Sequence, residues 1–191
     1  MQRPIVVVGS LNLDLVARVN HHPAIGETIT GLGFNTYCGG KGANQAVALA
    51  RLSAPVKMIG KLGSDAFAAQ LRHGIESAGV DASCVENVPG ASGTALILSS
   101  TNGDNSIVVI PGANAMLLPE DIERHRQQIE GAIECIAGPR GIYRLHSNSI
   151  DECRLNIPAG HVDSLVTPFE NHTSDTQSQE PVGRFLDRDC R

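Results

Sequence analysis

The feature that most constrains the fold is a run of β-branched residues at the start of the chain. Ile5 to Val8 form an uninterrupted apolar segment that ends at Gly9 and Ser10. A strand with apolar side chains on both sides is typical of the interior of a parallel sheet, where both faces are covered. We therefore expect this strand to lie at the centre of an α/β sheet.

Helical and strand patterns then alternate along the chain. Residues 43–51 carry small and apolar side chains on most of one side, which indicates a helix packed on a sheet, and residues 56–63 indicate the next strand. Asp65 is the expected N-cap of a helix that runs to about Ala78, with Gly79 as its C-cap. This β-α-β-α order predicts a parallel, doubly wound sheet.

Other segments have the alternating pattern of half-exposed strands. Residues 26–38 are expected to form two short antiparallel strands around a turn. Residues 94–100 and 106–110 flank a loop that contains Asn-Gly, so they are expected to form a hairpin. Residues 111–132 follow, with a well-formed helix expected to start at Pro119.

The pattern changes after residue 132. An α/β chain should continue with a β-branched strand, but residues 132–191 show neither strand nor helix periodicity. Residues 171–181 are poor in apolar side chains and are expected to be disordered. We therefore divide the chain into an α/β part, residues 1–131, and an atypical tail, residues 132–191, which we expect to be poorly ordered. Our hypothesis is that the tail comes from a shifted reading frame or an alternative end.

Composition argues against several classes of function. A net charge of −5 disfavours a protein that neutralises a nucleic-acid backbone. The N-terminal apolar run is too short for a membrane span or a signal-peptide core, so we expect a cytoplasmic protein with no membrane partner. The five cysteines form no C-x-x-C pair and lack ligand-like spacing to the seven histidines, so we expect free thiols and no metal site.

A glycine-rich loop with one lysine, residues 39–42, precedes the first predicted helix. It is a poor nucleotide motif, because Gly42 replaces the hydroxyl residue of a Walker A loop and Gln45 replaces the third glycine of a dinucleotide fingerprint. The alternative is a tight turn that binds no ligand, and the spacing alone supports it about equally well. Asn44 favours a ligand, because its amide, the lysine and the free N–H groups of a helix N-terminus together suit hydroxyls or an anion.

Asn12 and Asp14 follow the first predicted strand. Residues two apart in extended backbone point the same way, and ligands of open α/β sheets bind at the carboxyl ends of strands. A carboxylate accepts hydrogen bonds and an amide both donates and accepts, so the pair suits neighbouring sugar hydroxyls. A polar turn with Asp14 as a local cap is the alternative, and it is about as probable for this stretch alone.

Taken in order, these motifs resemble the ribokinase family of carbohydrate kinases, also called the PfkB family. The similarity covers about residues 4–131 and is carried by GSLNLDL, GETITG, GGKGANQAVALARL and GTALILSSTNGDNSIVVIPGANA. The resemblance implies a three-layer α/β fold whose small β lid is formed by residues 27–38 and 94–110. It also implies ATP-dependent phosphorylation of a sugar, at the 5-hydroxyl of D-ribose for the ribokinase form that GGKGANQA matches.

The resemblance assigns roles to individual residues. The family's sugar-binding positions correspond to Asn12, Leu13, Asp14, Gly40, Lys41, Gly42, Ala43 and Asn44. Val109 corresponds to an apolar lid residue that lies against the sugar of a second subunit, which implies a homodimer formed through the lid strands. The family also uses ATP, Mg²⁺ and a monovalent cation, which its C-terminal half holds.

The sequence departs from the family in its last third. The family's catalytic base is the aspartate of a Gly-Ala-Gly-Asp motif, and this motif occurs nowhere in the 191 residues. The family has a sugar-contacting carboxylate on the strand after the helix at 120–130, and constant spacing places Arg140 at that position. We therefore expect the C-terminal half of the fold to be missing, no catalytic residue to be present, and the chain to be poorly stable and inactive alone. Fructose, deoxyribose or a nucleoside as substrate, or a non-catalytic sugar-binding or dimerisation fragment, stay open as alternatives.

Overall fold

The computed structural model describes residues 3–137, which are built around a parallel sheet that we call the body sheet. Its four strands, in spatial order, are β5 (Val80–Asn87), β4 (Val56–Leu62), β1 (Ile5–Val8) and β8 (Glu134–Ala137). β1 pairs in parallel with β4 on one side and β8 on the other. The interior position expected from its β-branched run is confirmed.

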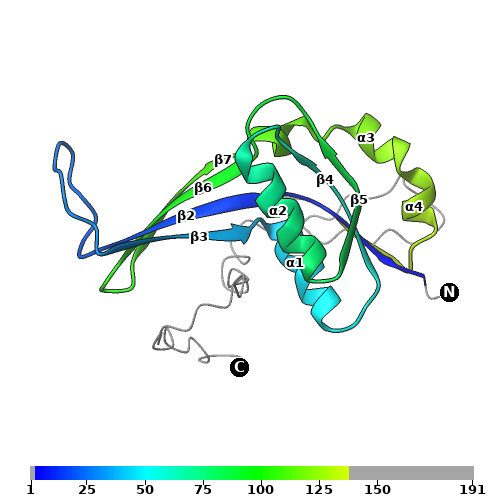
Figure 1. Ribbon diagram of the computed structural model, residues 1–191, viewed down its shortest axis with the longest axis horizontal. Helices are drawn as coiled ribbons and strands as arrows, with labels where there is room; N and C mark the ends of the chain where they lie inside the picture. Colours follow the sequence, from blue (N-terminus) through cyan, green and yellow to red (C-terminus); the bar gives the residue numbers. More distant parts are fainter. Residues whose placement is uncertain (1–2, 138–191) are drawn as a thin grey trace, which may run out of the picture.

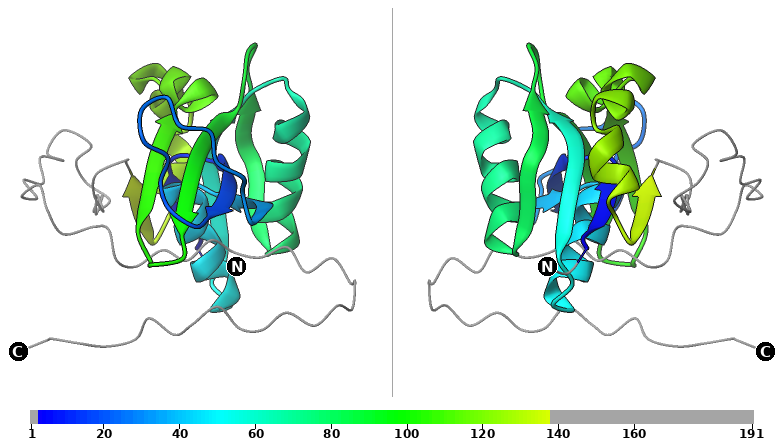
Figure 2. Two further views of the ribbon diagram at one scale, coloured as in Figure 1. Left: turned by 90° about the vertical axis from the view of Figure 1, so that its left-hand side faces the viewer. Right: turned by 90° about the vertical axis from the view of Figure 1, so that its right-hand side faces the viewer.

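Helices lie on both sides of the body sheet (Figure 2). They are α1 (Lys41–Arg51) and α2 (Ala66–Ser77) on one face, and α3 (Pro119–Arg124) and α4 (Arg126–Glu130) on the other. Val7 belongs to the core under α1 and α2, whereas Val6 and Val8 belong to the core under α3 and α4. Neighbouring side chains of one strand thus supply two cores, and the expected three-layer α/β class is confirmed. Within residues 3–137, no helix has the length and apolar character needed to span a membrane.

A second sheet extends away from the body, and we call it the lid sheet (Figure 1). Its strands, in spatial order, are β3 (Gly33–Gly39), β2 (Asn12–Val19), β6 (Gly93–Ser100) and β7 (Asn105–Ile110). β2 and β6 run parallel, and the two outer strands are antiparallel to their neighbours. The β6–β7 hairpin confirms the prediction made from its Asn-Gly loop.

The structure corrects the prediction for residues 26–38. Two strands were expected there, but only Gly33–Gly39 is a strand, and its antiparallel partner is β2. β2 was not predicted as separate from the first strand, although residues 12–19 alternate polar and apolar side chains over much of their length. Gly9–Leu11 lie between the two strands, so the chain leaves the body sheet and enters the lid sheet at this point.

Two further predictions are wrong in detail. The helix expected from Pro119 is broken at His125, whose N–H donates to the carbonyl of Ile122 three residues earlier instead of continuing the α-helical pattern. A 3₁₀ turn, η1 (Gly112–Met116), comes before it. A strand, β8, does follow residue 132, but four residues are too few to show a period. Residues 138–191, with Arg140 and most of the predicted tail, lie outside the described residues.

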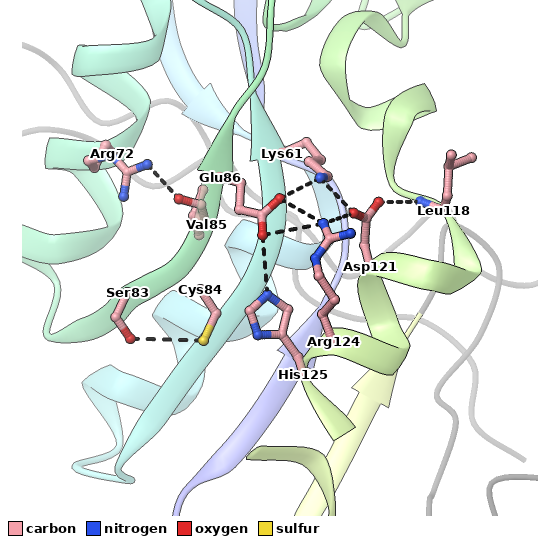
Figure 3. A network of polar contacts seen from close by, with 10 residues as sticks. All are labelled: Lys61, Arg72, Ser83, Cys84, Val85, Glu86, Leu118, Asp121, Arg124 and His125. Carbon is pink, nitrogen blue, oxygen red and sulfur yellow. Dashed lines mark hydrogen bonds and ion pairs between the residues drawn. The ribbon is translucent and has the colours of Figure 1, made fainter. Parts of the chain in front are cut away.

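A buried ion cluster connects α3 to the body sheet (Figure 3). Lys61 Nζ on β4 lies 2.8 Å from Asp121 Oδ1 and 2.6 Å from Glu86 Oε2, and Arg124 contacts both carboxylates. Lys61 and Asp121 are each only 5% exposed. Burial alone would raise the pKa of Asp121, but the N–H of Leu118 and the charges of Lys61 and Arg124 lower this pKa to about 2. The cluster is therefore fully charged and paired at neutral pH.

Candidate functional site

Asn12 and Asp14 begin β2, at the point where the chain passes from the body sheet to the lid sheet. They are two residues apart in one strand and so lie on the same face of the lid sheet. The pairing register places Tyr37, Asp14, Ala95 and Val109 in one row across this face. Val109 is 57% exposed. The structure thus brings the predicted lid residue to the same face as the predicted sugar-binding pair.

The glycine-rich loop lies directly against this pair. A Cβ atom added at Gly39 would lie 2.4 Å from Oδ2 of Asp14, so only glycine fits beside that carboxylate. Gly40 has a φ of 97°, in the left-handed region, and a Cβ there would lie 2.6 Å from the carbonyl oxygen of Ser10. The two motifs singled out in the sequence are therefore neighbours in space, as the resemblance implies.

The N-terminus of α1 is packed against the chain rather than open to a phosphate. The N–H of Ala43 donates to the carbonyl of Ser10 at 3.1 Å. A Cβ at Gly42 would lie 2.7 Å from Cα of Gly9, so the backbones touch here. A phosphate site needs free N–H groups and room around them, so the loop does not fit a nucleotide phosphate. Leu13 is 1% exposed and packs in the core, so neither it nor Ala43 offers a side chain to a ligand.

The first turn of α1, which follows the glycine-rich loop, contains a polar atom without a protein partner. The Oδ1 atom of Asn44 is buried and accepts no hydrogen bond from the described residues. An unpaired buried acceptor costs about 1–3 kcal/mol, so a ligand donor at this position would be favourable. Lys41, three residues earlier on α1, is exposed and its side chain can only donate hydrogen bonds.

Asp14 is a half-buried carboxyl group with no hydrogen-bond donor among residues 3–137. Burial raises its pKa to about 6. It is therefore mostly ionised at neutral pH and free to accept hydrogen bonds from a ligand. Across residues 3–137, no group of three His, Cys, Asp or Glu side chains is placed to hold a metal ion.

Two residues at this site were not singled out by the sequence analysis. Asn114 in η1 donates from Nδ2 to Oδ1 of Asn12 at 2.8 Å. Gly93 begins β6, and a Cβ there would lie 2.0 Å from Nδ2 of Asn114 and 2.3 Å from Oδ1 of Asn12. Both lie in the segment GTALILSSTNGDNSIVVIPGANA, but nothing local shows that its two ends meet at Asn12.

Comparison with known proteins finds relatives among sugar kinases. The chain is 45% identical over 127 residues to deoxyribokinase from Salmonella typhi and 45% identical over 129 residues to ribokinase from Bacillus subtilis. These matches cover 66% and 67% of this chain but only 42% and 44% of the relatives. The structure of Arabidopsis thaliana ribokinase complexed with ribose and ATP matches with a TM-score of 0.59 at 34% identity, over 69% of this chain and 44% of that one.

The chain therefore spans less than half the length of these relatives. Residues 2–154 match the pfkB family of carbohydrate kinases, which is most of the 191 residues. Together with the three-layer fold and the order of the motifs, this match shows that the chain belongs to the pfkB family of carbohydrate kinases.

Proposed function

We propose that this chain carries the sugar-binding half of an ATP-dependent kinase that phosphorylates D-ribose at its 5-hydroxyl. The observation that carries the proposal is the contact of the glycine-rich loop with Asp14, together with polar groups that lack partners on β2 and in the first turn of α1. Asp14 has no donor and Asn44 Oδ1 has no partner within the described residues. A carboxylate and an amide on β2, with a further amide in the first turn of α1, match a ligand with several adjacent hydroxyls better than they match an anion.

The proposed roles follow from hydrogen-bonding capacity. Asp14 accepts from two neighbouring hydroxyls, Asn12 donates to a hydroxyl oxygen, and Asn44 accepts through Oδ1. The ammonium of Lys41 donates at the rim of the site. Leu13, Gly42 and Ala43 stay predicted substrate-binding positions that act through backbone and packing, and Gly40 acts through the close approach that its missing Cβ permits.

The phosphoryl donor is proposed by relationship. The Arabidopsis relative is described as complexed with ribose and ATP, and we propose ATP, with Mg²⁺ and a monovalent cation, for the complete enzyme. The glycine-rich loop at 39–42 does not fit the nucleotide phosphates, because its backbone packs against Ser10 and Gly9. A missing general base by itself lowers a rate by about 10² to 10⁴. We therefore propose that the 191-residue chain is inactive alone, and that the enzyme is a cytoplasmic homodimer joined through the lid.

Isothermal titration calorimetry of the 191-residue chain with D-ribose and with ATP tests the proposal. The expected result is binding of ribose, loss of that binding in Asp14→Ala, and no binding of ATP. Asp104→Ala, at the exposed end of the lid hairpin, is the matched control and should bind ribose normally. Absence of any sugar binding would contradict the proposed site, and ribose phosphorylation by the purified chain would contradict the proposed inactivity.

A second substrate is supported equally well by similarity. The deoxyribokinase and ribokinase relatives have the same 45% identity to this chain, so similarity does not choose between ribose and 2-deoxyribose. Parallel titrations with the two sugars separate the candidates. A sugar lacking the 2-hydroxyl should bind about tenfold or more weakly if a site group is paired with that hydroxyl, and equally well if none is.

A further inference from the structure

The side chain of Asn114 bridges the backbone and the first residue of the site. Its Oδ1 accepts from the N–H of Leu11 at 2.9 Å, and its Nδ2 donates to the carbonyl of Leu11 at 3.0 Å. The same Nδ2 donates to Oδ1 of Asn12 at 2.8 Å. Because a backbone N–H only donates and a carbonyl only accepts, Leu11 leaves just one orientation for the Asn114 amide.

The orientation of Asn114 in turn fixes that of Asn12. The Nδ2 group of Asn114 can only donate, so the Asn12 atom that faces it must be the oxygen. The Nδ2 group of Asn12 is then the end that remains for a ligand, and no described residue accepts from it. An amide that could in principle donate or accept is therefore held as a donor.

This polarity complements Asp14. The ionised carboxylate of Asp14 only accepts, and Asn12 lies two residues away on the same face of β2. One accepting group beside one donating group can bind both the hydrogen and the oxygen of the same hydroxyl, or of two adjacent ones. If Asn12 were turned over, two acceptors would face the sugar, and one sugar oxygen would lose its donor.

We propose that Asn114 is a positioning residue that sets Asn12 as a hydrogen-bond donor to the sugar. The proposal rests on the proposed function, since it assigns the way in which the same site recognises hydroxyls. The contact also has little freedom to shift. Gly93 lies so close that a Cβ there would fall within 2.3 Å of both amides, so the three residues form one tightly packed group.

The test is a double-mutant cycle on D-ribose affinity at about pH 8, where Asp14 is ionised. Asn114→Asp keeps the acceptor for Leu11 but removes the donor, so Asn12 must turn to donate to the new carboxylate. Ribose is uncharged and does not respond to the new charge directly. We expect affinity to fall about tenfold in the wild-type background, the value of one lost hydrogen bond with an unpaired partner, and not to fall further in Asn12→Ala. Equal losses in both backgrounds, or none in the wild type, would overturn the proposal.

Asn87→Asp is the matched control. Asn87, the last residue of β5, accepts from the Arg72 side chain and donates from Nδ2 to the carbonyl of Gly63. Its substitution therefore removes the same kind of donor at a residue that makes no hydrogen bond to Asn12. Its ribose affinity should equal that of the wild type.

A second measurement needs no sugar. In ¹⁵N-labelled free chain, the side-chain amide signals of Asn12 should shift in Asn114→Asp and not in Asn87→Asp. Unchanged Asn12 signals would overturn the proposal even if the chain binds ribose. A wild-type chain that binds no sugar would instead contradict the proposed function, and the Asn12 signals would still decide whether Asn114 orients that amide.

Discussion

The carboxyl group of Asp14 links pH to both stability and binding. Burial raises its pKa from 3.8 to about 6. Between about pH 4 and 6 the folded chain keeps a proton that the unfolded chain has released, so the contribution of this group to the free energy of unfolding falls as pH rises through that window. Above it, the folded state holds a partly desolvated charge that, in the proposed site, a sugar hydroxyl would neutralise by hydrogen bonding.

We expect Asp14→Asn to stabilise the sugar-free chain at about pH 7.5 by about 1 kcal/mol, less than the full shift implies because the side chain is only half-buried. The same substitution should strongly weaken ribose binding. Urea unfolding at about pH 7.5 and pH 4 measures the effect, which should vanish at the lower pH, where the wild-type carboxyl is neutral in the folded chain. The exposed Glu120→Gln serves as the control, and an equal gain at both pH values would contradict the prediction.

Asp121 is the opposite case, because its pKa of about 2 lies below its ordinary value of 3.8. Its contribution to stability is present above about pH 4 and is lost as pH falls towards 2. We expect Asp121→Asn to lower the free energy of unfolding by about 3 kcal/mol, since Lys61 stays buried with Glu86 as its remaining carboxylate partner. Chemical denaturation measures this. Glu123→Gln, which breaks an exposed pair with Arg126, should have no measurable effect, and similar losses in the two variants would refute the role of burial.

The elements bounded by clear cap or turn residues were predicted well. Asp65 accepts from the N–H of Ala68 at 3.1 Å and is the N-cap of α2, as its position before the apolar pattern indicated. Gly79 follows the same helix with a φ of 91°, the conformation that favours glycine at a helix end. The turn residues between β6 and β7 similarly predicted a hairpin.

The cap of α2 also holds a distant loop, and this leads to a prediction. Asp65 accepts from the N–H and the hydroxyl of Ser92, at 2.8 and 2.7 Å, immediately before β6 begins. Asp65→Ala should therefore destabilise the chain by about 2 kcal/mol, more than a cap alone, and should speed hydrogen exchange at the Ser92 amide. Asp65→Ser keeps a capping oxygen and should recover part of the stability. Unchanged exchange at Ser92 in Asp65→Ala would contradict the second role.

The strands that were not predicted from the sequence are defined by their pairing with strands that are distant in the sequence. β2 is separated from β1 only by Gly9–Leu11, and what makes it a separate strand is its pairing with β3 and β6 in another sheet. β8 has four residues and is recognisable because it pairs with β1 at the other end of the described chain. Local pattern carries no information about either pairing.

Across the whole molecule, the same limit applies to the site. Asn12, Asp14 and the loop at 39–42 could be named from motifs and from resemblance, and the structure places them together. Asn114 could not, because its bond to Asn12 joins residues 102 positions apart. Which residues orient the ligand-binding groups depends on tertiary contacts, which no spacing rule reveals.

The proposed homodimer gives a prediction at this scale. Val108 and Val109 are 59% and 57% exposed and alternate on β7, so they lie on opposite faces of the lid sheet, with Val109 on the face of Asp14. Val109→Lys should dissociate the proposed dimer, and Val108→Lys should leave it intact, because in the proposal only the face of Val109 meets the partner. Sedimentation equilibrium distinguishes these results. Equal effects of the two substitutions, or a monomeric wild type, would refute dimerisation through this face.

The bridge made by Asn114 also has a consequence for biosynthesis. A ribosome releases the chain from its N-terminus, so Asn12 and Asp14 emerge about a hundred residues before the amide that orients Asn12. β8, which pairs with β1, is synthesised later still. So are Gly131 and Ala132, whose carbonyls accept hydrogen bonds from the Arg3 side chain. Until then the nascent chain exposes an unpaired edge of a very apolar strand. We therefore expect the candidate site and the β1–β8 edge of the body sheet to be completed late in synthesis, because both need residues beyond 110.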